Sequence, residues 1–170
     1  MACDINIGRA QPCKDGLGGQ STLYLYNGLE DAFTVAAGEA TAINALLDEV
    51  YAFPLEGDGN TLEQSMVGDR NTGSKVNTQT LTTVLKKMDA ATNAQFNLLV
   101  AGYPQAVVVD RNGNFIALGL DDGIDFTVVA STGGAKTDMN GYTLTGVATT
   151  KDLAPLLDSA TQTAFKALEV

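Results

Sequence analysis

Residues 74–85 constrain the fold of this chain more than any other segment. From Val76 to Val84, valine and threonine occupy every second position, and the positions between them hold asparagine, glutamine, leucine and threonine. This two-residue period, rich in β-branched side chains, predicts a strand. Residues 61–67 form a second such run, so the polar tip at 68–73 predicts a long hairpin. Because neither face of the hairpin is strongly apolar, we expect it to need a partner surface.

The composition extends the prediction of β structure to the whole chain. Its 170 residues suit one domain, and 45% of them are hydrophobic, which is enough to bury a core. Nineteen threonines and 18 glycines favour strands joined by tight turns. Besides the hairpin, we expect strands at residues 21–26, 32–36, 50–55, 103–110, 114–120, 124–130 and 141–149, and an edge segment at 152–157.

Three segments carry helical signals. Residues 41–50 have the apolar spacing of a short amphipathic helix. A helix at 89–101 would begin at Asp89 as its cap and bury a stripe of Phe96, Leu99 and Val100. Residues 159–168 begin with a serine and a glutamine at capping-box spacing.

The expected fold class is therefore mainly β with a minority of helix. We expect an antiparallel β-sandwich or barrel-like domain at residues 21–158, with one flanking helix. Residues 1–20 would form an N-terminal arm and residues 159–170 a C-terminal helix or arm. Asn112-Gly113 is the strongest short hairpin signal and predicts a type I′ turn, with both residues in the left-handed region.

Charge is unevenly distributed. Twenty acids and ten bases give a net charge of −10 and a pI near 4.2, so we expect no binding to DNA or to anionic membranes. No base lies between Lys14 and Arg70, an interval that holds Glu30, Asp31, Glu39, Asp48, Glu49, Glu56, Asp58, Glu63 and Asp69. These acids either solubilise the surface or keep another polyanion from binding, and composition does not choose between the two.

The absence of histidine excludes several kinds of chemistry. Ser-His-Asp and Cys-His catalysis and histidine-ligated metals need a residue that this chain lacks. Cys3 and Cys13 match no zinc or redox spacing, so we expect free thiols of a reducing cytoplasm, with a disulfide as the alternative. No apolar run is long enough to cross a membrane, and we expect no secretory signal.

The remaining motifs have simpler structural explanations. The acids and amides at 110, 112, 114 and 121 suggest a calcium loop, but its glycine is fourth rather than sixth. The acids at 121–125 lack an aromatic cleft for acid–base catalysis. The glycines at 16–19 lack the lysine of a phosphate loop, and the basic pair at 86–87 is too small to bind nucleic acid. We therefore expect no enzyme, and no catalytic, metal or cofactor site.

The second half of the chain carries a resemblance. Residues 106–119 read AVVVDRNGNFIALG, residues 122–127 read DGIDFT and residues 138–146 read DMNGYTLTG, followed by an Ala-Pro pair at 154–155. This order of hairpin and strands resembles the tail-tube (major tail) proteins of tailed phages. The resemblance covers residues 103–155, whereas residues 1–48 match no motif of that family.

The resemblance implies a structural protein of the virion, made in the host cytoplasm. It implies a β-sandwich that assembles with copies of itself into stacked rings, which we expect to be hexameric, around an acidic lumen. Other tail proteins would be partners, genomic DNA would pass through without specific binding, and no membrane insertion or cofactor is implied. The two arms would then connect subunits.

Two sets of residues become candidates on this interpretation. Acids from residues 56–63 or from 121–125 would line the bore, which gives Glu56, Asp58, Glu63, Asp121, Asp122 and Asp125. Contacts between subunits would involve the hairpin tip and the end of its second strand, which gives Met66, Asp69, Arg70, Lys75, Lys86 and Lys87.

A second function class stays open. A β-sandwich could instead decorate a virion or act as an adhesion module that binds a protein or a glycan. Aromatic clusters on the loops would favour that alternative, but the loops at 68–73, 121–123 and 131–140 carry none. An enzyme is a third alternative, disfavoured by the missing histidine.

Overall fold

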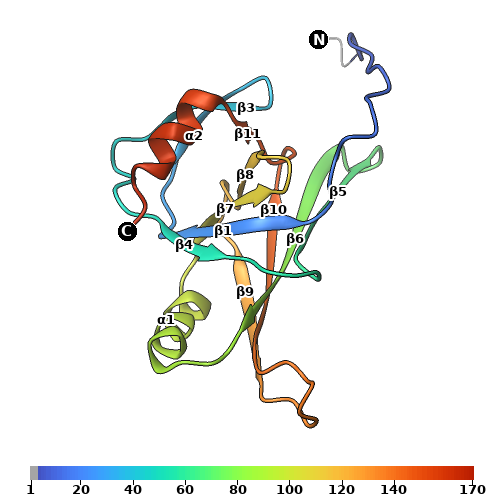
Figure 1. Ribbon diagram of the computed structural model, residues 1–170. Coiled ribbons are helices and arrows are strands. Elements are labelled where there is room, and N and C mark those ends of the chain that lie inside the picture. The colour runs from blue at the N-terminus through green and yellow to red at the C-terminus, as the bar shows by residue number, and fades with distance from the viewer. Residues whose placement is uncertain (1–3) are drawn as a thin grey trace.

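The computed structural model describes residues 4–170, which form two β-sheets and two helices (Figure 1). Strands account for 44% of the chain and helices for 12%, which confirms a mainly β fold. The helices are α1 (Ala90–Ala101) and α2 (Ser159–Lys166). The strands are β1 (Gln20–Tyr26), β2 (Phe33–Ala36), β3 (Glu39–Ile43), β4 (Tyr51–Pro54), β5 (Thr61–Asp69), β6 (Ser74–Lys86), β7 (Gln105–Asp110), β8 (Phe115–Leu118), β9 (Asp125–Ser131), β10 (Gly141–Thr150) and β11 (Leu156–Leu157).

The larger sheet has seven strands in the order β2-β3-β11-β8-β7-β1-β4. The pairings in this sheet are antiparallel, as expected, except that β11 pairs in parallel with β3, so the sheet is mixed. The expected edge segment at 152–157 is wrong, since β11 lies inside the sheet. Pro155 does not prevent this because it precedes the strand, and its carbonyl accepts the N–H of Ala117 at 3.1 Å.

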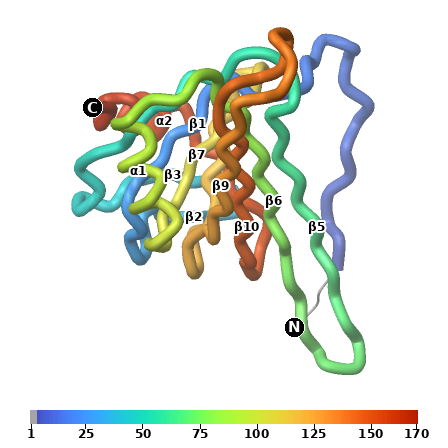
Figure 2. The backbone as a smooth tube through the Cα atoms, turned by 90° about the horizontal axis from the view of Figure 1, so that it is seen from below, coloured from blue at the N-terminus to red at the C-terminus, as the bar shows by residue number. Residues whose placement is uncertain are grey.

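The smaller sheet has four antiparallel strands in the order β5-β6-β10-β9. The predicted hairpin is confirmed as β5 and β6. Its expected partner surface is found within the chain, where β10 pairs with β6 from Asn77 to Lys86. Residues 67–76 extend past that pairing, and in Figure 2 the hairpin projects well beyond the body.

Two apolar clusters divide the molecule into layers. The first lies between the sheets and joins Leu23 of β1 and Leu81 of β6 with Phe96 of α1. The second lies on the other face of the seven-stranded sheet, where α2 covers it. Phe165 of α2 is fully buried there, with its ring 5.3 Å from that of Tyr24 in an edge-on contact. Burial of one such side chain stabilises the fold by about 1.5–3 kcal/mol.

The helix expected at 41–50 does not form. Ala37 and Gly38 both have positive φ, at 53° and 83°, and join β2 to β3 in a two-residue hairpin turn. Residues 39–43 therefore continue as a strand, which suits the β-branched side chains of Thr41 and Ile43. The apolar residues at 41–50 do not share one buried face, because Leu47 and Val50 are buried in the core whereas Leu46 is exposed.

The hairpin at Asn112-Gly113 forms with a different turn from the predicted type I′. Only Gly113 has positive φ (84°), and Asn112 does not. The N–H of Gly113 donates to Asp110 O at 3.2 Å, and the N–H of Asp110 donates to Asn114 O at 3.0 Å. These bonds define a three-residue loop in which a left-handed glycine follows a type I turn.

Substitution of Gly113 by valine is expected to destabilise the fold by about 1–2 kcal/mol, because a β-branched residue would be held in the left-handed region. A Cβ at this position would meet no atom within 4 Å, so the cost comes from the backbone alone. Urea denaturation measures the effect, with Gly8→Val as control, since Gly8 has open space and no positive φ. Equal midpoints for both variants would contradict the prediction.

Both helices begin at an aspartate cap. The prediction of Asp89 is confirmed, since its Oδ1 accepts the N–H of Thr92 at 2.8 Å. In α2 the cap is Asp158, one residue before the expected serine, and its Oδ1 accepts the N–H of Thr161 at 2.7 Å. That bond holds the pKa of Asp158 below its ordinary value of 3.8. On α1 only Phe96 of the expected stripe is fully buried, Leu99 is half-buried, and Val100 is exposed.

Acid is expected to destabilise the protein partly through the Asp158 cap. Because the folded state lowers this pKa, its stabilisation is complete above the ordinary pKa and is lost as the pH falls through the folded value. Asp158→Asn keeps a good cap that does not titrate. The urea midpoint of the variant should therefore fall less than that of the wild type between about pH 5 and pH 2. Parallel curves would contradict this.

Candidate assembly surfaces

The projecting hairpin exposes apolar side chains that the fold leaves without a partner. Met66, Val67 and Val76 are all exposed near its tip. Exposed apolar side chains that gather on one segment are common at contacts between proteins. The turn at the tip also exposes Arg70, and Asp69 Oδ1 accepts the N–H of Asn71 at 2.8 Å.

The six residues expected at subunit contacts lie at the two ends of β6. Four of them, Met66, Asp69, Arg70 and Lys75, belong to the hairpin tip or its approach. Lys86 ends the strand on the body, where its Nζ lies 3.4 Å from Glu56 Oε2. The next residue, Lys87, has a φ of 62° and turns the chain toward α1.

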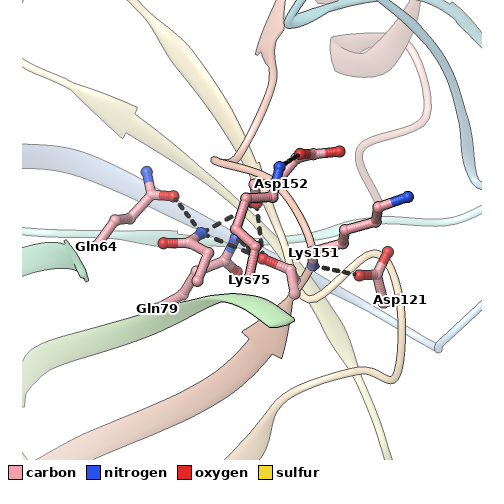
Figure 3. Close-up of polar contacts among 8 residues, drawn as sticks. Gln64, Lys75, Gln79, Asp121, Lys151 and Asp152 are labelled. Carbon is pink, nitrogen blue, oxygen red and sulfur yellow. Dashed lines mark hydrogen bonds and ion pairs between the residues drawn. The ribbon is translucent and has the colours of Figure 1, made fainter. Parts of the chain in front are cut away.

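A buried network of amide side chains fixes the hairpin to the body (Figure 3). Asn77 is fully buried, and its Nδ2 contacts Gln64 Oε1 at 3.1 Å, Thr150 Oγ1 at 3.2 Å and Asp152 O at 3.0 Å. Gln79 Nε2 donates to Thr150 Oγ1 at 3.3 Å, and its Oε1 accepts the N–H of Gly119 at 3.0 Å.

The network joins the base of the hairpin to β10 and to residues 152–154, although Asn77 Oδ1 is buried without a partner. Buried polar groups that are paired in this way are costly to separate, so the base of the hairpin is held firmly. Lys75 adds an exposed ion pair with Asp152, and exposed pairs of this kind contribute little. Sequence reasoning missed the network, although amides on the same strand face as Leu81 were its visible signal.

The two outermost strands of the four-stranded sheet have backbone groups that point outward. Backbone hydrogen bonds alternate sides along an antiparallel strand. The N–H of Val84 points toward β5 and donates to Asn60 Oδ1 at 2.8 Å. The N–H of Lys87 points toward β10 and donates to Asn140 O at 2.6 Å. Even-numbered residues of β6 therefore bond to β5. On the outer edges of the sheet, some N–H and C=O groups therefore point away from the neighbouring strand. From the strand register, they belong to Leu62, Gln64, Met66 and Gly68 of β5 and to Phe126, Val128 and Ala130 of β9.

The outer face of the four-stranded sheet is neutral or acidic and rich in threonine. The register aligns Glu63, Thr80, Val147 and Asp125 in one row across all four strands. All four side chains are exposed or half-buried, so the row lies on the face away from the core. Among the strand residues of this face, the one base is Lys86, at the end of β6. The threonines of the face are Thr61, Thr78, Thr80, Thr82, Thr127, Thr143, Thr145 and Thr149.

The six candidate lumen acids lie in three different parts of the structure. Glu63 and Asp125, one from each of the two expected sets, share the outer face just described. Glu56 and Asp58 lie in the β4–β5 connection, where Glu56 pairs with Lys86. Asp121 and Asp122 lie in the turn before β9, and Asp121 Oδ2 accepts the N–H of Lys151 at 2.9 Å. The two sets are thus not alternatives, since each contributes one residue to the face.

The N-terminal arm is attached at its base by one side chain. Asn112 Oδ1 accepts the N–H of Leu17 at 2.9 Å, and Asn112 Nδ2 donates to Leu17 O at 2.8 Å, as a paired strand would. Residues 4–18 form no strand or helix, and both views show them extended away from the body (Figures 1 and 2). Cys13 is exposed. Cys3 lies outside the described residues, so the state of the two thiols stays a prediction.

The loop that suggested calcium satisfies its own carboxylate. Asp110 Oδ1 accepts the N–H groups of Asn112 and Asn114, both at 2.8 Å, and its Oδ2 accepts Asn114 Nδ2 at 2.8 Å. Burial raises the pKa of Asp110, but the bonds from Asn114 and Asn112 together outweigh it and lower the pKa below its ordinary value. Within residues 4–170, no group of three or more cysteine, aspartate and glutamate side chains is placed to hold a metal ion.

Comparison with known proteins identifies no relative of this chain. No protein-family model, curated protein or solved structure matches the chain. Within residues 4–170, no helix combines the length and the apolarity needed to cross a membrane.

Proposed function

We propose that this protein is the structural subunit of a phage tail tube, located in the virion, whose stacked rings enclose a DNA-conducting lumen. The observation that carries the proposal is the four-stranded sheet, which combines two outward-bonding edge strands with a neutral to acidic outer face. The sequence resemblance over residues 103–155 points to the same class.

The edges of the sheet support closure into a ring. Successive strands alternate in direction from β5 through β6 and β10 to β9. The β5 strand of one copy would therefore run antiparallel to β9 of the next, and the pattern continues around a closed cylinder without a defect. α1 packs against β9, and its Phe96 lies in the core between the sheets, with its ring 4.9 Å from that of Tyr142 of β10. Closure is also the physical remedy for an exposed edge strand.

The outer face of the sheet supports a DNA conduit. Duplex DNA carries one negative charge per about 1.7 Å of its length, so a wall of fixed cations would hold it. The face presents Glu63, Asp125 and threonine hydroxyls, with Lys86 at one end. If the core-facing side of the sheet points outward in a ring, this face lines the bore.

The hairpin supports stacking of rings. It extends beyond the sheet, exposes Met66, Val67 and Val76, and is held at its base by the buried amide network. A hairpin of one copy that contacts a different surface of the next makes a heterologous contact, and such contacts propagate as a filament. In this role the protein is a structural component and performs no catalysis.

Imaging of the purified chain tests the proposal directly. Negative-stain micrographs and sedimentation velocity are expected to show rings or tubes at high protein concentration. Slow growth without an initiating complex is consistent with the proposal, so the concentration series should extend over days. A chain that stays monomeric throughout, with well-protected amides across residues 61–85, would overturn it.

A further inference from the structure

A groove between α1 and the end of the seven-stranded sheet is apolar and open. It has a volume of about 520 Å³ and is lined mainly by aromatic and aliphatic side chains, among them Tyr51, Phe53, Phe96, Leu98, Leu99 and Tyr103. Leu98 is 68% exposed and Tyr103 71% exposed. α1 itself contains no charged residue in twelve positions, which is unusual for a helix that faces water.

The groove is built rigidly around Tyr103. A Cβ on Gly28 would lie 2.3 Å from Tyr103 O, and one on Gly123 would lie 2.8 Å from the same atom. The backbone of Tyr103 is therefore held closely between two glycines, which no larger residue could replace without a shift. A rigid backbone that presents an exposed aromatic ring is a feature of binding surfaces rather than of a solvated loop.

The N-terminal arm has the complementary features. Ile5 is 94% exposed and Ile7 is 81% exposed. In an extended chain, side chains two residues apart point to the same side, so both isoleucines can enter one groove. Between its two acids, Asp4 and Asp15, the arm carries the bases Arg9 and Lys14. The groove residues named above include no base, and at its rim Tyr51 donates its hydroxyl to Glu49 Oε2 at 2.8 Å.

The arm and the groove lie at opposite sides of the molecule. The arm enters β1 at Gln20, whereas the groove lies at the other end of that strand, beside Tyr26. Both views place α1 on the side opposite the arm (Figures 1 and 2). The arm as it stands therefore points away from the groove of its own chain.

We propose that the groove between α1 and β4 binds the N-terminal arm of a second copy, through Ile5 and Ile7, with Arg9 near Glu49. The contact is heterologous, so copies joined by it form a ring where the rotation between them closes and an open series where it does not. It deepens the proposed function by naming one contact between subunits, but it rests on the arm and the groove and does not require a tube.

Crosslinking between differently labelled copies tests the proposal. In a background with Cys3→Ser and Cys13→Ser, an isotopically heavy Ile7→Cys copy is mixed with a light Leu98→Cys copy and oxidised. Mass spectrometry is expected to find heavy–light disulfides between positions 7 and 98 at least tenfold above a control mixture. The control replaces Leu98→Cys by Thr127→Cys, on the outer face of β9. Equal yields in the two mixtures would overturn the proposal.

A second variant makes the result independent of cysteine chemistry. Ile5→Asp with Ile7→Asp is expected to weaken self-association at least tenfold in sedimentation velocity. Folding should be unchanged, because both side chains are exposed. Unchanged association would overturn the arm contact. Tubes without the 7–98 disulfide would refute this contact alone, whereas crosslinked chains of copies without rings or tubes would refute the proposed function alone. A monomeric chain without the disulfide would refute both.

Discussion

Met66→Pro is expected to abolish ring and tube formation at protein concentrations where the wild-type chain assembles fully. The N–H of Met66 points away from β6, so proline removes an edge donor without removing a bond of the hairpin. Each lost contact costs about 1–3 kcal/mol where a partner carbonyl is left buried and unpaired. A ring repeats this loss at every contact between subunits.

Two further variants separate loss of the edge from loss of the fold. Met66→Leu keeps the N–H and the apolar side chain, and it should assemble as the wild type does. Ser65→Pro removes an N–H that bonds to β6, so it should lower the urea midpoint, which Met66→Pro should leave nearly unchanged. Sedimentation velocity and urea denaturation are measured on all three. If Met66→Pro assembles like the wild type, β5 does not join subunits through its edge.

Local signals were sufficient for the long strands and the hairpin. In β6 and β10 the two-residue period extends over ten or more positions, so the strands and their faces follow directly from the side chains. The tip of the hairpin contains a run of polar and glycine residues that favours a turn in any context. Asp89 was recognisable as a cap because its carboxylate needs only the N–H three residues later.

Contacts between distant segments could not be read from local patterns. β11 is two residues long and owes its place to Ala40 and Ile116, residues far from it in sequence. The apolar spacing at 41–50 fits a helix equally well, and only the turn at Ala37-Gly38 decides for a strand. In the same way, Asn77 and Gln79 look like solvated positions until β10 and the 151–154 segment enclose them.

The candidate lumen acids show the same division. Sequence identified both acidic sets, but their relation depends on strand register. Glu63 pairs with Thr80, Thr80 with Val147, and Val147 with Asp125, so three successive pairings bring the two acids onto one face. Glu56, by contrast, forms an ion pair with Lys86. A count of charges along the chain contains none of this information.

Reversal of the acids on the outer sheet face is expected to turn the assembled tube from a conduit into a DNA-binding channel. The double variant Glu63→Lys with Asp125→Lys places two cations per subunit on the face that would line the bore. Folding should change little, since both sites are exposed. Tubes assembled with short duplex DNA should then protect it from nuclease, and the protected amount should fall steeply between about 50 and 200 mM salt.

A control double variant has the same net charge, but its two added lysines lie away from the outer sheet face. Glu39→Lys with Asp48→Lys alters two exposed acids of the seven-stranded sheet and its following loop. Such tubes could bind DNA on the outside, but that DNA stays open to nuclease, so protection should match the low wild-type value. Equal protection by the two double variants would show that total charge matters and position does not, which would contradict the assignment of this face to the lumen. Strong protection by wild-type tubes would contradict it as well, because an acidic wall gains nothing from a confined polyanion.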